Sequence, residues 1–167
     1  RKPVEFIKQI LEPSGGEIER PKDWFYAEGH RGKTLMWTIS AEDSSKGSYI
    51  TGVRIQLFFG VQEQTGQSPE AFIRDFVKGK KAKAEVLEEC DETEQGMFKR
   101  ICLEVVEGDY HILYSLFWGK EMDMAAVSIA GTTKALWSTH SATFDKMSKF
   151  KALDMKHIEK KAAEEKK

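Results

Sequence analysis

The chain has 167 residues, of which 40% are hydrophobic and 32% are charged, and its formal net charge is −1. This length and balance are those of one soluble globular domain. A net charge near zero gives no bulk attraction to nucleic acid, and no apolar run approaches the roughly 20 residues that span a bilayer. We therefore expect neither a nucleic-acid partner nor a membrane span.

The N-terminal segment is expected to lie outside the main domain. Residues 4–11 place apolar side chains at spacings that predict one or two helical turns, and the Pro-Ser-Gly-Gly run at residues 13–16 ends them. The chain begins with Arg1 rather than Met, which either a removed leader or a shortened sequence would explain. Residues 1–16 are therefore interpreted as an N-terminal extension, and an extracytoplasmic location is one alternative.

The next part of the chain predicts strands separated by polar loops. Residues 17–20 can begin a short edge strand. Residues 34–40 alternate between apolar and polar side chains, which is typical of a strand, and residues 49–60 predict another. Residues 62–67 are polar, so we expect a mobile connection there.

A helix is predicted to begin at Ser68-Pro69-Glu70. Ser is a preferred N-cap residue, Pro suits the first helical position, and an acid in the first turn complements the helix dipole. The face expected to be buried consists of Phe72, Ile73, Phe76 and Val77. The C-terminal end is crowded by Lys78, Lys80, Lys81 and Lys83. For these lysines, a solvated helix end is favoured over a surface for an acidic partner.

The densest apolar material lies between residues 96 and 150. Strands are predicted over residues 97–106, 110–118 and 122–130, and a helix from about Thr133, where the threonine hydroxyls can cap it. The segment 110–118 is apolar on both of its faces, unlike a strand with one side in water. We therefore expect this strand to lie inside the sheet, with helices covering both faces.

Two cysteines, Cys90 and Cys102, do not define a disulfide framework. Residues 84–90 predict a strand, followed by an acidic turn, and a hairpin turning near Gln95-Gly96 would place the cysteines across from each other. Two reduced, half-buried thiols are the favoured interpretation, and a bridge between neighbouring strands is the alternative. The chain has no C-x-x-C pair and its histidines are scattered, so we predict no metal site and no cofactor.

No catalytic residue is predicted. Residues 29–34, Gly-His-Arg-Gly-Lys-Thr, look like the end of a phosphate-binding loop, but Ala27 stands at the first glycine position and a strand follows. His140 lies on the apolar stripe of the last helix, without an orienting acid or an exposed nucleophile. Asp109 and His111 have the spacing of two metal ligands, but nothing identifies a third.

The four tryptophans of the chain are better explained by packing than by a platform for sugars or bases. Three of them, together with one histidine, are nevertheless the residues that we name for a partner or ligand surface. This candidate surface consists of Trp24, Trp37, Trp118 and His111.

The order of the predicted elements resembles the PsbP-like superfamily. The resemblance rests on Arg20-Pro21-Lys22-Asp23-Trp24, on Ser68-Pro69-Glu70-Ala71-Phe72 and on the run from Gly96 through Phe144, and it covers about Glu17 to Leu153. The superfamily is named for the extrinsic photosystem II protein, and it includes a Ran-binding nuclear-import factor and bacterial domains of unknown function. The resemblance implies an α/β/α sandwich that binds or stabilises another protein, and it favours a bacterial branch over either named member.

The predicted fold class is α+β, an α/β/α sandwich with a central, mainly antiparallel sheet. We expect one domain over residues 17–153 and a charged, solvated or frayed helical tail over residues 154–167. The favoured function is a non-catalytic protein-binding or accessory domain, exported in one interpretation, with another protein as partner. The alternatives are a small-molecule-binding domain with a cleft between the sheet and a helix, and an enzyme whose site is not visible in sequence. The oligomeric state is left open.

Overall fold

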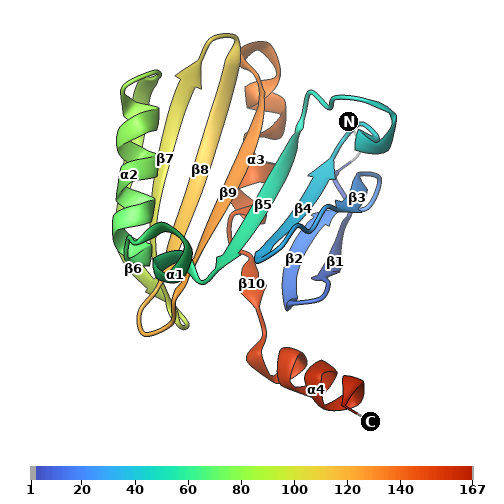
Figure 1. Cartoon of the computed structure of the whole chain (residues 1–167). Coiled ribbons are helices and arrows are strands. Elements are labelled where there is room, and N and C mark those ends of the chain that lie inside the picture. Colours follow the sequence, from blue (N-terminus) through green and yellow to red (C-terminus); the bar gives the residue numbers. More distant parts are fainter. Residues whose placement is uncertain (1–2, 167) are drawn as a thin grey trace.

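The backbone of the computed structural model, which describes residues 3–166, forms two antiparallel sheets (Figure 1). The larger sheet has the strand order β3-β4-β5-β9-β8-β7-β6, and the smaller one has the order β1-β2-β10. The strands of the larger sheet are β3 Phe25–Glu28, β4 Thr34–Ser40, β5 Gly52–Phe59, β6 Glu85–Gln95, β7 Phe98–Glu107, β8 Tyr110–Gly119 and β9 Met124–Thr133. The strands of the smaller sheet are β1 Phe6–Leu11, β2 Gly15–Pro21 and β10 Lys151–Leu153. The predicted fold class, α+β with a central antiparallel sheet, is confirmed.

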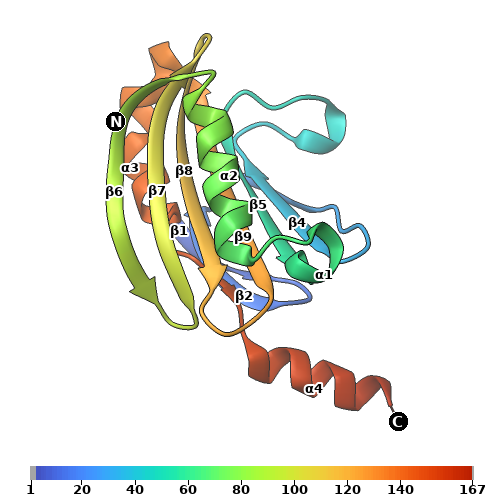
Figure 2. The ribbon, with the colours of Figure 1, turned by 60° about the vertical axis from the view of Figure 1, so that its left-hand side comes forward.

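Helices join the strands and cover both faces of the larger sheet. Their bounds are η1 Ser44–Lys46, α1 Val61–Thr65, α2 Pro69–Lys81, η2 Lys134–Leu136, α3 Trp137–Met147 and α4 Met155–Glu165, where η denotes a short 3-10 segment. Helix α2 packs on one face, against β8 and β9, and α3 packs on the other, against β9 and β2 (Figure 2). Within residues 3–166, none of the helices combines the length and the apolarity that crossing a bilayer needs.

Strand β8 lies inside the sheet, as its two-sided apolar pattern predicts. It pairs with β7 on one side and with β9 on the other. Tyr114 and Leu116 belong to the core cluster under α2, whereas Phe117 belongs to the cluster on the side of α3. Each face of this strand therefore contributes to a different core.

Helix α2 begins as its sequence predicts. The hydroxyl of Ser68 accepts a hydrogen bond from the backbone N–H of Ala71, at 3.1 Å, which satisfies one free donor of the first turn. Ile73 is buried, and Phe72, Phe76 and Val77 pack against the same core.

The face on the side of α3 is covered more completely, because the smaller sheet adds a second layer beside the helix. Phe144 and Met147 of α3 are buried together with Leu11 and Ile18 of the smaller sheet. The expected threonine cap is wrong: Thr133 precedes η2 without a side-chain capping bond. The hydroxyl of its neighbour Thr132 is instead hydrogen-bonded to that of Thr51, at 2.7 Å.

The helical turns expected near the N-terminus are wrong, because this segment forms strand β1. β1 pairs with β2 along its whole length, from Phe6 opposite Pro21 to Leu11 opposite Gly16. β2 is central in the smaller sheet rather than at an edge, since β10 pairs with its other side. Burial of Leu11 and Ser14 fixes this arrangement, and the Ser14 hydroxyl donates to the carbonyl of Ala152 at 2.7 Å.

Three further segments differ from the sequence-based expectations. The connection expected to be mobile contains helix α1, and the expected acidic turn after Cys90 continues strand β6 to Gln95. The C-terminal segment is helical but not freely solvated, since Met155 and Ile158 of α4 pack against the core. The domain limits at residues 16/17 and 153/154 stay predictions, and the extreme residues 1–2 and 167 lie outside the described part of the chain.

The two cysteines face each other across the predicted hairpin. Cys90 of β6 is the direct register partner of Cys102 of β7, and their Cα atoms are 5.1 Å apart. The structure joins them in a disulfide. The favoured interpretation of two free thiols is therefore wrong for this structure, and the alternative of a bridge between neighbouring strands holds.

Candidate functional site

The four residues named from the sequence as a candidate surface do not share one surface. Trp118 packs in the core under α2, whereas Trp24 and Trp37 belong to the core on the opposite face. Trp37 is fully buried, and its indole N–H donates to the carbonyl of Glu12 at 2.8 Å. A binding role for any of these residues stays a prediction.

His111 is held by packing and by one carboxylate. Its Nε2 lies 2.9 Å from a carboxylate oxygen of Glu104, and its ring stacks on Trp137 with 3.7 Å between centroids and 3° between planes. The hydrogen bonds described for His111 lead to no hydroxyl or thiol. His140 lies 6.0 Å from the ring of Trp24, and burial lowers the pKa of this histidine. The geometry around both histidines is that of packing.

The segment that looks like a phosphate-binding loop is a tight turn between two strands. Arg31 and Thr34 form an isolated bridge at the turn, and strand β4 follows it where a phosphate-binding loop would continue into a helix. Lys33 is engaged elsewhere, in an ion pair with Glu63 of α1 at 3.0 Å. Among residues 3–166, no three His, Cys, Asp or Glu side chains come together as a group that could hold a metal ion.

A groove of about 640 Å³ opens where the β4–β5 loop, residues 41–51, meets the ends of three strands of the larger sheet. We call it the loop groove. It is lined by Ser44, Gly47, Ser48, Tyr49, Ile50, Gly52, Arg54, Tyr110, Ile112, Ile129 and Gly131. The loop lies beyond the ends of β4 and β5 (Figures 1 and 2). Its groove borders the sheet face that carries α2, since Ile112 and Ile129 belong to the core under that helix.

The base of the loop is fixed by polar contacts. One carboxylate oxygen of Glu42 accepts hydrogen bonds from the backbone N–H groups of Ile50 and Thr51, both at 3.0 Å. Asp43 caps η1 by accepting from the N–H and the hydroxyl of Ser45, and these bonds lower the pKa of the Asp43 carboxyl. The loop therefore presents its side chains from a defined position, which reduces the entropy lost when a ligand binds.

Apolar and aromatic side chains dominate the walls of the groove. Ile112 and Ile129 form its floor as part of the core under α2. Ile50 is 46% exposed and Tyr110 is 37% exposed, although both are large apolar or aromatic residues. Tyr49 is half-buried, and burial raises the pKa of its hydroxyl. The groove thus offers water-exposed apolar area that the fold itself does not cover.

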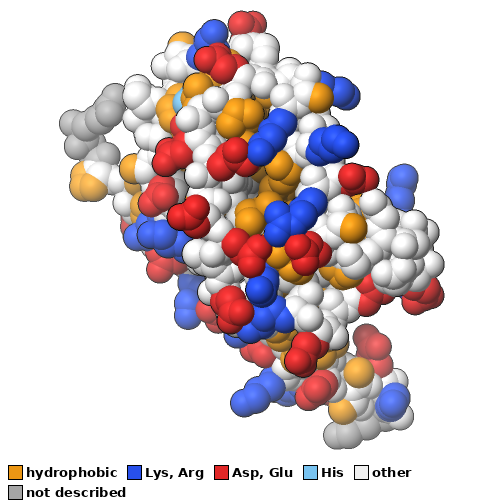
Figure 3. Space-filling view, turned by 90° about the vertical axis from the view of Figure 1, so that its left-hand side faces the viewer, with side chains coloured by type: hydrophobic (Ala, Val, Ile, Leu, Met, Phe, Trp, Pro, Cys, Tyr) orange, Lys and Arg blue, Asp and Glu red, His pale blue; other side chains and the backbone are white. Residues whose placement is uncertain are grey.

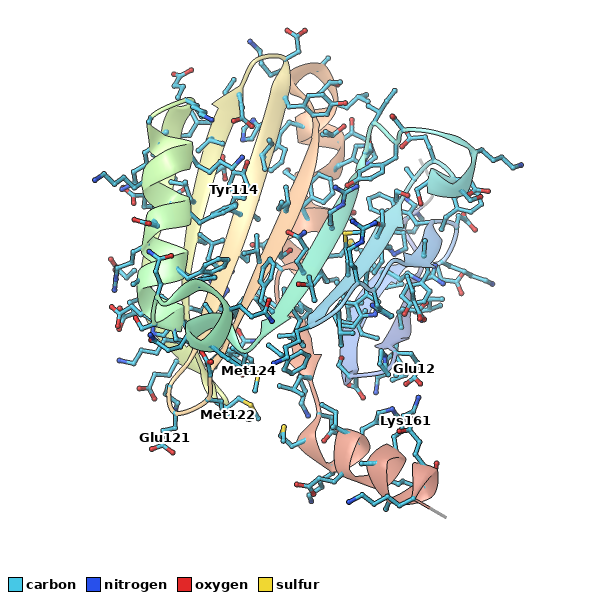
Figure 4. All side chains as sticks on the ribbon, viewed as in Figure 1. Glu12, Tyr114, Glu121, Met122, Met124 and Lys161 are labelled. Carbon is cyan, nitrogen blue, oxygen red and sulfur yellow. A yellow bond between two sulfur atoms is a disulfide. The ribbon has the colours of Figure 1, made fainter. Side chains whose placement is uncertain are left out.

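Two cations of this face lie beside aromatic rings. The guanidinium of Arg54 lies 5.9 Å from the ring centre of Tyr49, and the amine of Lys80 on α2 lies 5.5 Å from the ring centres of Phe76 and Tyr114. Tyr114 lies on β8 beside α2 (Figure 4), and burial raises its pKa to about 12. In the described part of the chain, neither cation takes part in an ion pair.

A smaller and more apolar pocket, of about 270 Å³, lies between the β6–β7 turn and β10. Three phenylalanines, Phe98, Phe117 and Phe150, form its walls together with Met97 and Leu153. The side-chain amide of Gln95 donates to the carbonyl of Phe150 at 2.8 Å and so closes one side. This pocket lies between the sheet and a strand. The sequence-based alternative of a ligand cleft between the sheet and a helix stays a prediction.

Sequence reasoning missed the residues of the loop groove. Tyr49, Ile50 and Arg54 fall within a segment that reads as one continuous strand from residue 49, and only the polar run before it hints at a loop. Tyr110 and Ile129 come from distant parts of the chain. Antiparallel pairing alone brings them together, since Arg54 is the register partner of Ile129, and β8 pairs with β9.

No family model matches the chain, and no curated protein matches it at a significant level. The structure is similar to the solution structure of cyanobacterial PsbP (CyanoP) from Synechocystis sp. PCC 6803. The TM-score is 0.55 at 13% sequence identity, and the match covers 92% of this chain and 95% of the other. At this identity the likeness concerns the fold alone, and the fold is PsbP-like.

Proposed function

We propose that the protein is a non-catalytic accessory domain that binds a partner protein through the loop groove. The observation that carries this proposal is the exposed apolar area of Ile50 and Tyr110 beside the guanidinium of Arg54, which forms no ion pair with any of residues 3–166. Tyrosine and arginine are enriched among the residues that dominate binding energy at protein interfaces. The PsbP-like fold of the cyanobacterial structure supports an accessory role, as the sequence resemblance implies.

The chemistry of the groove favours one class of partner segment. An apolar side chain would fill the floor between Ile112 and Ile129, and a neighbouring carboxylate would pair with Arg54. A carboxylate that approaches a guanidinium at a partly desolvated site forms a stronger hydrogen bond than it does in open water. Lys80 extends the positive potential along α2. We therefore expect an extended segment that combines aliphatic and acidic residues.

Selection from a random peptide library tests this proposal. The wild-type chain serves as bait, and peptides that bind the support without the protein are removed in a counter-selection. We expect the surviving peptides to place Asp or Glu next to an aliphatic residue. Their affinity, measured by fluorescence anisotropy, should fall at least about tenfold for Arg54→Glu and for Ile50→Asp, because each variant removes one part of the recognition.

Lys83→Glu is the matched control, because it reverses one exposed charge beyond the end of α2 and outside the groove. Its affinity for the selected peptides should lie within about twofold of the wild-type value, because salt screens the effect of a distant charge. If the selected peptides bind Arg54→Glu and Ile50→Asp as tightly as the wild type, or if no peptide is enriched, the loop groove is not the partner site.

A small-molecule-binding function is the second candidate, because the apolar pocket between the β6–β7 turn and β10 has the character of a ligand site. Ala152 lines this pocket, so Ala152→Phe would fill it from within. A medium-chain alkane alcohol should raise the melting temperature of the wild type and leave that of Ala152→Phe unchanged. An equal rise in both proteins would exclude specific binding in this pocket.

A further inference from the structure

The disulfide lies at an accessible and irregular part of the larger sheet. Cys90 and Cys102 are both half-buried, and β6, which carries Cys90, is the edge strand. The pairing of β6 with β7 shifts register between Cys90 and Thr93, so the ladder is interrupted directly after the cysteine pair. A small thiol can therefore approach the sulfur atoms, and the edge strand has freedom to separate from its neighbour locally.

The guanidinium of Arg100 points at one of the two sulfur atoms. Its Nη1 lies 3.8 Å from Sγ of Cys90, and its Nη2 donates to the hydroxyl of Ser115 at 3.2 Å. The side chain is half-buried, and burial lowers the pKa of Arg100. Within residues 3–166, no carboxylate forms an ion pair with it.

A half-buried cation without an anion is costly, and the Cys90 thiolate would be its natural counter-ion. In the disulfide the sulfur is neutral, so it does not offset the desolvation cost of the Arg100 charge. In the reduced protein, a Cys90 thiolate would receive a charge-assisted contact from Arg100. The arrangement therefore stabilises the reduced, ionised state relative to the disulfide.

Nearby carboxylates would destabilise a Cys90 thiolate, but they lie farther along the strands or on α3. On β6 and β7, Glu88 is opposite Glu104, two residues from the cysteines, and His111 of β8 binds Glu104. The charge of Asp145 on α3 partly opposes the lowering of the Arg100 pKa that burial causes. None of these carboxylates hydrogen-bonds a sulfur atom among the described contacts, whereas Arg100 does.

The opposite side of the hairpin, toward α2, is a shallow groove of about 620 Å³ that Cys90 and Cys102 also line. Its rim carries Arg74, Lys78 and Lys81 from α2 and Glu89, Asp91 and Glu92 from β6. Four of these groups are paired, in the Arg74–Glu92 contact at 3.0 Å and in the Lys81–Glu89 pair. Figure 3 shows this side of the molecule, where acidic and basic side chains intermix around hydrophobic atoms.

We propose that Cys90 and Cys102 form a thiol–disulfide exchange site, with Cys90 as the nucleophile and Arg100 as a positioning residue, and with thiols and disulfides as its substrates. The Cys90 thiolate attacks one sulfur of a substrate disulfide, and the other sulfur leaves as a thiolate that takes a proton from water. Cys102 then loses its proton to water and attacks the Cys90 sulfur of the mixed disulfide, which releases the second substrate thiolate. Two electrons pass from the cysteine pair to the substrate, which is reduced to two thiols, and the reverse sequence reduces the protein.

The ionisation of Cys90 gives the first test. Cys102→Ser leaves one thiol, and its alkylation by iodoacetamide is followed against pH in this variant and in Cys102→Ser with Arg100→Gln. We expect the midpoint of the pH profile to lie lower when Arg100 is present, and alkylation at neutral pH to be about tenfold faster. Arg100→Lys should restore part of the effect, because it keeps the positive charge.

The second test uses the full chain equilibrated with defined ratios of reduced and oxidised glutathione, with mass spectrometry as the readout. Arg100→Gln should shift the equilibrium toward the disulfide, because its reduced state loses the counter-ion of the thiolate. The ratio of reduced to oxidised glutathione that reduces half of the protein should rise about tenfold. Lys99→Gln is the matched control, since Lys99 is adjacent on β7 and its amine pairs with Glu92 at 3.2 Å.

Either of two results would overturn the proposal. The first is two free thiols in the air-equilibrated full chain, which would show that the bridge does not form. The second is a Cys90 pH profile that is the same with and without Arg100, which would show that the guanidinium does not act on the sulfur. Circular dichroism of each variant distinguishes both results from a loss of fold.

Discussion

The two faces of the larger sheet are covered to different extents. On the side of α3, a helix and a three-stranded sheet together bury Phe144, Met147, Leu11 and Ile18. On the side of α2, this helix packs against β8 and β9 with Ile73 buried, and Val61 of the short helix α1 belongs to the same core. The sheet area beyond this helix borders the loop groove, with Ile50 and Tyr110 exposed. One face therefore provides most of the packing, and the other has apolar area left for contacts with another molecule.

This difference separates stability from binding within one sheet. Residues under α3 and the smaller sheet are enclosed, so a change there removes packed apolar contacts and leaves a cavity. The exposed residues of the loop groove, Ile50 and Tyr110, lie at the surface, where most substitutions change the free energy of unfolding little. The comparison predicts that the loss of stability decreases from the enclosed core to the loop groove. Each variant below tests one part of this order.

The largest effect is expected from Phe144→Ala, in the enclosed core. Phe144 is fully buried and contacts the rings of Trp24 and Trp137. We expect its loss to lower the free energy of unfolding by about 3–5 kcal/mol, measured by urea denaturation. Phe76→Ala is the control. Phe76 is a half-buried residue of α2, so its loss should lower the free energy of unfolding by less. An equal loss for both variants would show that the two faces contribute alike.

Helix α4 should give the next largest effect, because it adds to the more covered face. Met155 and Ile158 pack against the core on that side, and Lys161 reaches Glu12 in the β1–β2 connection (Figure 4). Deletion of residues 155–167 should lower stability by about 2 kcal/mol, the value of two partly buried apolar side chains. Deletion of residues 162–167 is the control, since it keeps these contacts. Equal melting temperatures for all three proteins would show that α4 does not dock in solution.

Much of the larger sheet follows from the sequence. The two-sided apolar pattern of residues 110–118 predicts an interior strand, and Ser68-Pro69 predicts the start of α2, because both signals are local and strong. The smaller sheet does not follow in this way. A short apolar pattern such as residues 6–11 fits a strand or a helical turn equally. Its identity is decided by its pairing with β2, which pairs on its other side with the distant strand β10.

The candidate sites show the same limit. Hairpin geometry is enough to place Cys90 opposite Cys102, but the sequence does not show whether a bond joins them, nor that Arg100 points at the sulfur. The loop groove depends on the register that brings Arg54 opposite Ile129. Its residues carry no motif, because recognition by apolar area and one charge requires proximity in space rather than a fixed spacing in the chain.

A smaller effect is expected from the acid dependence of the contact between α4 and Glu12. The hydrogen bond from Lys161 is the main cause that holds the pKa of Glu12 below its ordinary value of 4.5. His157 Nε2 also lies 2.9 Å from this carboxylate. Because the folded state binds the proton less tightly than the unfolded chain, the stabilisation is present above pH 4.5 and is lost as the pH falls through the lowered folded-state pKa.

Glu12→Gln should therefore lower stability at neutral pH by less than about 1 kcal/mol, since the pair is partly exposed and screened. The difference between this variant and the wild type should disappear in acid, as measured by thermal unfolding at a series of pH values. Glu17→Gln is the control, because Glu17 pairs with Lys8 at 3.8 Å on the surface. A difference that persists unchanged at low pH would contradict a role of the Glu12 charge.

The smallest effect on stability is expected from Ile50→Ser in the loop groove. The side chain is 46% exposed, and its backbone N–H keeps the hydrogen bond to Glu42 whatever the side chain is. The free energy of unfolding should change by no more than about 0.5 kcal/mol, while affinity for the selected peptides falls. Ile39→Ser, fully buried on the neighbouring strand β4, is the contrasting variant and should be strongly destabilised. A comparable loss of stability in both variants would mean that Ile50 supports the fold, and the loop groove would then lose its main argument as a binding surface.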